Sequence, residues 1–65
     1  MRAMRIEEHA RYFELRRKLV RGTISEMEAI ELKALNEKFA RKARTGMERH
    51  LAKVTRLMLE EVLGG

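Results

Sequence analysis

Two histidines, His9 and His50, are the residues best suited to bind a metal ion or to move a proton. The chain has no cysteine, no Gly-rich phosphate loop, and no His-x-x-x-His or Glu-x-x-His pair that would put two metal ligands on one helix face. Glu8 and Glu48 would lie near the histidines in an up-down-up bundle, but two histidines do not complete a zinc site. We therefore expect a protein that is not an enzyme, with no catalytic residues, no metal and no cofactor.

Basic residues gather in one segment, from Lys38 to Arg56. It contains seven Lys or Arg and a single acid, whereas residues 25–37 contain four Glu and one Lys. Ten of the 15 basic residues in the chain are Arg, whose planar guanidinium binds carboxylates and phosphates through two hydrogen bonds at once. The segment predicts a surface for an acidic protein partner or for a nucleic-acid backbone, formed by Lys38, Arg41, Lys42, Arg44, Arg49, Lys53 and Arg56.

Base-specific reading of nucleic acid is not expected from this surface. A helix-turn-helix needs a small buried residue four positions before its turn glycine. In this chain that position holds Lys18 before Gly22 and Lys42 before Gly46. The three aromatic residues occupy predicted core positions and are not free to stack on bases. Any contact with nucleic acid would therefore be made through the phosphates.

Strong helix formers dominate the elements that must carry this surface, and proline and tryptophan are absent. No segment shows the two-residue alternation of a strand, so the sequence predicts an all-α protein with one small domain over residues 1–65. The first helix is expected over about 3–21, ending at Gly22, since glycine enters the left-handed conformation without a Cβ penalty. Ser25 and Glu28 form a capping box that begins a second helix over about 26–44.

The signals conflict at Thr45-Gly46, before a third helical segment over about 47–63. Thr45 and Glu48 match a second capping box, and a glycine inside a helix costs about 1 kcal/mol relative to alanine. An apolar stripe nevertheless crosses this point in unbroken helical register. It consists of Leu32, Leu35, Phe39, Ala43, Met47, Leu51, Val54, Met58 and Val62.

We favour a continuous or kinked helix, which would be roughly 57 Å long from Glu26 to Leu63. The first helix covers only half of that length, so the stripe predicts a homodimer in which a helical hairpin assembles into a dimeric bundle. The alternative is a monomeric three-helix bundle with a basic end. No run of 18 apolar residues predicts a membrane span, and we expect a cytoplasmic protein.

These features predict a non-catalytic interaction module, an adaptor or regulator, that self-associates through the stripe and docks on an acidic partner. The alternative is a nucleic-acid-binding protein that contacts the phosphate backbone. Nothing in the sequence points to a small-molecule substrate.

Overall fold

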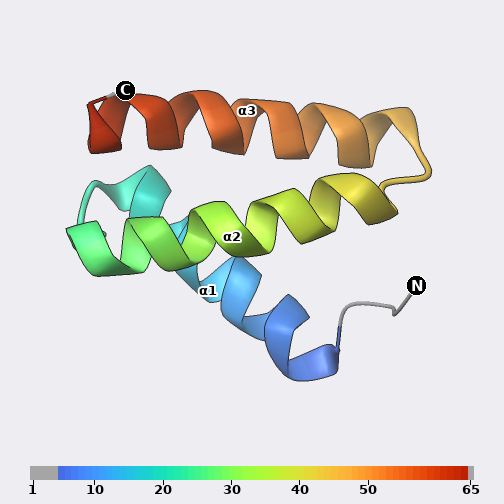
Figure 1. Ribbon diagram of the computed structural model, residues 1–65, viewed down its shortest axis with the longest axis horizontal. Coiled ribbons are helices and arrows are strands. Elements are labelled where there is room, and N and C mark those ends of the chain that lie inside the picture. Colours follow the sequence, from blue (N-terminus) through green and yellow to red (C-terminus); the bar gives the residue numbers. More distant parts are fainter. Residues whose placement is uncertain (1–4, 65) are drawn as a thin grey trace.

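Three helices make up the computed structural model, which describes residues 5–64. They are α1 (Ile6–Arg21), α2 (Glu26–Lys42) and α3 (Gly46–Leu63), so the all-α prediction is confirmed for this part of the chain. The predicted start of the first helix, about residue 3, lies outside the described residues. In Figure 1, α2 and α3 run side by side, and α1 crosses α2 at a steep angle.

The capping residues predicted from the sequence end α1 and begin α2 at the hairpin between them. Gly22 adopts the left-handed conformation with φ 77°, and the amides of Gly22 and Thr23 donate to the carbonyls of Leu19 and Lys18. The Ser25 hydroxyl accepts from the Glu28 amide at 3.1 Å, and the Glu28 carboxylate accepts from the Ser25 amide at 3.0 Å. Each cap satisfies backbone groups that the helix end leaves without partners.

The prediction of one long helix is wrong at residues 43–45, where the chain reverses. Thr45 caps α3 through its hydroxyl, and the Glu48 carboxylate accepts from the amides of Arg44 and Thr45 at 2.9 and 3.2 Å. Because this one carboxylate satisfies two backbone donors, a connection of three residues is enough to turn the chain. The described chain measures 30 × 23 × 18 Å along its principal axes, as expected for the three-helix alternative.

The core draws on all three helices. On α3 the buried line is Ala52, Thr55 and Leu59, one position away from the predicted stripe. The buried hydrophobic side chains are Tyr12, Leu15, Leu19, Ala29, Leu32, Phe39, Ala52 and Leu59.

Buried polar groups tie the three helices together inside this core. Tyr12 of α1 donates to the Asn36 Oδ1 of α2 at 2.6 Å, and the Asn36 amide donates to the Ala52 carbonyl of α3 at 3.0 Å. Arg16 donates from Nε to the Thr55 hydroxyl at 2.7 Å. Since buried polar groups are costly unless they are paired, these bonds favour one relative position of the helices.

Candidate interaction surface

Ion pairs neutralise the side of the molecule where α1 meets α2. Lys18 contacts Glu28 at 2.6 Å, Lys38 contacts Glu8 at 2.6 Å, and Arg11 forms a two-bond contact with Glu31 at 2.9 and 3.0 Å. The Lys18 ammonium, with the Ser25 amide, lowers the pKa of Glu28 to about 2. The Lys38 ammonium likewise lowers the pKa of Glu8. Lys38, a residue of the predicted basic surface, is therefore paired with an acid of the same chain.

A cluster of cations lies around the end of the molecule where α2 turns into α3. Five of them form no ion pair among residues 5–64, and we call this set the basic pole: Arg41, Lys42, Arg44, Arg49 and Lys53. Four of the five are exposed, and Lys42 is half-buried.

Glu48, the single acid within the segment that holds the basic pole, has its carboxylate occupied. The amides of Arg44 and Thr45 donate to it and lower its pKa below the ordinary value of 4.5. The Glu48 carboxylate thus accepts hydrogen bonds from the turn and forms no ion pair with a cation of the basic pole.

Part of the basic pole lines a groove between α2 and α3. Arg49, Lys53 and Arg56 are spaced i, i+4 and i+7 and share one face of α3. Ala40 and Ala52 belong to the same groove, whose volume is about 300 Å³. Glu37 also lines the groove, so three cations and one carboxylate border it and leave it with a surplus of positive charge.

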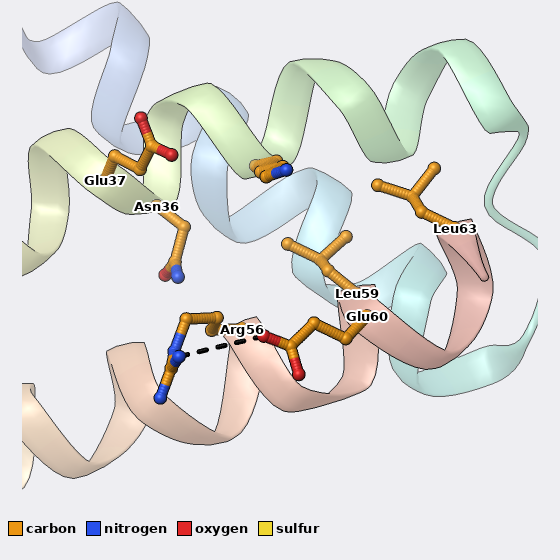
Figure 2. A pocket seen from close by; sticks show the side chains of 7 residues that line it. Asn36, Glu37, Arg56, Leu59, Glu60 and Leu63 are labelled. Atoms are coloured by element: carbon orange, nitrogen blue, oxygen red, sulfur yellow. Dashed lines mark ion pairs between the residues drawn. The ribbon is translucent and has the colours of Figure 1, made fainter. Parts of the chain in front are cut away.

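The groove continues towards the other end of the helices, where its charges balance. Figure 2 shows this cavity of about 290 Å³, with Leu59 and Leu63 on α3 and the Asn36 amide between the helices. Arg56 contacts Glu60 at 3.7 Å along α3, the dashed line of Figure 2. Lys33 and Glu37 also line the cavity. The surplus of positive charge therefore ends near Arg56, and the charges that line the second half of the groove balance.

The predicted self-association stripe is divided by the fold. Leu32 and Phe39 are buried in the molecule's own core, while Met47 and Val62 are 83% and 49% exposed. The other five residues are half-buried: Leu35, Ala43, Leu51, Val54 and Met58. Leu35, Leu51 and Met58 also pack against the core, so much of the stripe is used within the chain, and self-association through the stripe stays a prediction.

An aromatic hollow, which the sequence reasoning missed, opens where α1 spreads away from α3. The Phe39 ring stacks on Tyr12 at 4.6 Å and on His9 at 5.9 Å, and Phe13 meets it edge-on at 6.1 Å. The hollow measures about 420 Å³ and is lined by Ile6, His9, Ala10, Phe13, Phe39, Lys42 and Glu48. The seven-residue spacing of Ile6 and Phe13 places both on one face of α1 and could have indicated the hollow. It does not show that α3 leaves this face uncovered.

No helix within residues 5–64 is long and apolar enough to span a bilayer. No group of three or more His or Glu side chains in this range is placed to hold a metal ion.

Comparisons with protein-family models, with curated proteins and with solved structures find no match for this chain.

Proposed function

We propose that this chain is a non-catalytic interaction module that docks on an acidic protein through its basic pole. The observation that carries the proposal is the contrast between two parts of one surface. Where α1 packs on α2, Arg11, Lys18 and Lys38 are paired with carboxylates, whereas the five cations clustered in the basic pole have no such partner among the described residues. Unpaired charges of one sign on one surface attract a partner of the opposite sign and speed its association.

The side chains beside the turn between α2 and α3 support an anionic ligand there. Arg44, Arg49 and Lys53 lie in or near the first two turns of α3. The positive dipole end of α3 is offset at this turn by the negative dipole end of α2 and by the Glu48 carboxylate. We therefore centre the docking surface on these three cations.

Nucleic acid is the second candidate, favoured by the row of Arg49, Lys53 and Arg56. Seven residues of helix span roughly 10 Å, or about three base-pair steps of 3.4 Å along one strand. The row would therefore follow a short run of phosphates. We rank this candidate second because it leaves unused the apolar hollow beside Lys42.

Fluorescence anisotropy with two labelled ligands tests the proposal. The ligands are poly-glutamate, which is disordered at neutral pH, and a short duplex DNA, each titrated at several salt concentrations. Arg44→Gln/Arg49→Gln is expected to weaken poly-glutamate binding about tenfold at low salt, because two contacts of about 0.7 kcal/mol are lost. The matched control is Arg17→Gln/Arg21→Gln, which removes two exposed cations of α1 that have no ion pair among the described residues.

Each result has a defined meaning. Equal losses in the two double variants would show that only net charge matters and would overturn the basic pole as a site. Binding of duplex DNA alone, with a steep salt dependence, would select the second candidate. Binding of neither ligand at low salt would refute both.

A further inference from the structure

The aromatic hollow combines an apolar interior with an apolar side chain, Ile6, that no residue within 5–64 covers. Phe39 is 6% exposed and Phe13 is half-buried, whereas Ile6 is 87% exposed. A fully exposed isoleucine contributes little to the fold, and burying it on binding would contribute about 1.5–3 kcal/mol. Met47, 83% exposed in the first turn of α3, adds a second uncovered apolar side chain at the same end of the molecule.

The shape of the hollow suits an apolar side chain presented by another helix. Its volume of about 420 Å³ falls in the range of about 300–1,000 Å³ of sites that bury a ligand group. Its walls come from α1 on one side and from α2 and α3 on the other. A depression between helices receives an amphipathic helix, whose apolar face supplies the anchoring side chains.

Charge decides between a second copy of this chain and a different partner. Lys42 lines the hollow and has no ion pair among the described residues, while the carboxylate of Glu48 is held by the amides of Arg44 and Thr45. In a twofold dimer centred on the hollow, Lys42 of each copy would lie close to Lys42 of the other. The chain also carries a net charge of +5. These like charges disfavour a second copy and favour an acidic occupant.

We propose that the aromatic hollow is the anchor site for an acidic amphipathic helix of a partner protein. One large apolar side chain of that helix enters the hollow between Ile6, Phe13 and Phe39, and its carboxylates meet Lys42 and the basic pole. This inference rests on the proposed function in one respect, that the partner is an acidic protein. It adds the secondary structure of the partner and the place where its apolar side chain is buried.

The test uses a labelled synthetic peptide of about 20 residues, long enough to be helical in water. The peptide carries Leu on one face and Glu on the other. Ile6→Gln and Ala10→Gln change the rim of the hollow without touching the buried core, and each is expected to weaken peptide binding at least about fivefold. Met27→Gln is the matched control, because Met27 is 81% exposed on α2 and does not line the hollow.

Two further ligands separate this inference from the proposed function. Poly-glutamate binding should be unchanged in Ile6→Gln, since the hollow is not needed for charge alone, and a peptide with Lys in place of Glu should not bind. If poly-glutamate binds through the basic pole but Ile6→Gln, Ala10→Gln and Met27→Gln all bind the peptide equally, the hollow is overturned and the basic pole stands. If poly-glutamate does not bind while Ile6→Gln still weakens the peptide, the proposed function fails and the hollow stands.

Self-association is the remaining outcome. Sedimentation equilibrium of the native chain and of Ile6→Gln would reveal a dimer that the substitution dissociates, and that result would assign the hollow to a second copy instead. Equal binding of the acidic and the basic peptide would also contradict the proposal, since charge would then not select the occupant.

Discussion

Asn36 connects all three helices through two buried hydrogen bonds. It is 5% exposed, accepts from Tyr12 and donates to the Ala52 carbonyl. Asn36→Ala leaves the Tyr12 hydroxyl without its partner and opens a cavity, and we expect it to lower the free energy of unfolding by about 2–4 kcal/mol. Urea unfolding followed by circular dichroism measures this loss.

Two comparisons make the Asn36 prediction specific. Glu37→Ala, at the exposed neighbouring position, should change the free energy of unfolding by no more than about 0.5 kcal/mol. In a double-mutant cycle, Tyr12→Phe and Asn36→Leu should show a coupling energy of about 1 kcal/mol, since each removes the other's partner. Additive effects would contradict a shared hydrogen bond.

Glu28 ties stability to pH, also at the scale of single residues. Its pKa is about 2 in the folded chain, below the ordinary value of 4.5, because of Lys18 and the Ser25 amide. A lowered folded pKa stabilises the fold above pH 4.5, and that contribution is lost as the pH falls towards 2. We therefore expect the melting temperature to fall over this range.

The pKa values of Glu8, Glu31 and Glu48 are also lowered, so these groups act in the same direction. Thermal melts between pH 2 and 7 should show a shallower dependence for Glu28→Gln. Lys18→Gln should show the same change, and the double variant should add little to either. Full pH dependence in both single variants would contradict the role of this ion pair.

At the scale of elements, Thr45 and Gly46 decide whether α2 and α3 are two helices. Thr45→Ala removes a cap and is expected to lower the free energy of unfolding by about 1 kcal/mol. Gly46→Ala is expected to raise it by up to about 0.5 kcal/mol, since Gly46 is helical and a Cβ there meets nothing within 4 Å. In one continuous helix, Thr45→Ala would stabilise instead, because alanine is the better helix former.

Gly22→Ala provides the contrasting glycine. Gly22 has φ 77°, where a Cβ is strained although the surrounding space is open, so a loss of about 1–2 kcal/mol is expected. Equal effects at Gly22 and Gly46 in urea unfolding would contradict the assigned conformations.

The same turn shows how far the sequence predicts this fold. Gly22, Ser25 and Glu28 identify the first hairpin because each fills a backbone need that few other residues meet. At Thr45-Gly46 the capping box predicts a turn and the apolar stripe predicts a continuous helix. The cap and the glycine each contribute only about 1 kcal/mol, which does not decide between the two structures. The reversal is accompanied by long-range contacts such as the hydrogen bond from Asn36 to the Ala52 carbonyl, which sequence spacing does not show.

The candidate surface was predictable in part, for a similar reason. The cluster of cations is evident from the order of residues, but the pairing of Lys38 with Glu8 joins residues 30 positions apart. The aromatic hollow depends on the angle at which α1 crosses α2 (Figure 1). Helical periodicity gives the faces of each helix but not that angle.

At the scale of the whole molecule, size separates the compact bundle from a long helix. The described chain has a Cα radius of gyration of 11.2 Å and a longest dimension of 30 Å. A helix over residues 26–63 would be roughly 57 Å long. Small-angle scattering of the native chain should give a compact particle, and a maximum dimension near the longer value would contradict the reversal at residues 43–45.

The unbroken register of the stripe across this short turn predicts that the compact form can be converted into the extended one. Thr45→Ala/Gly46→Ala removes the cap and the helix-breaking glycine together, while Phe39, Ala43, Met47 and Leu51 keep their four-residue spacing. If α2 and α3 fuse into one helix, they no longer pack against each other within one chain. Each chain must then bury the exposed core surface against a second copy, as in domain swapping. We expect this variant to dimerise with rising concentration into a particle about twice as long, as measured by light scattering and small-angle scattering. Gly46→Ala alone keeps the Thr45 cap and should stay compact, and a compact monomer for the double variant at high micromolar concentration would show that the core, rather than the cap, enforces the turn.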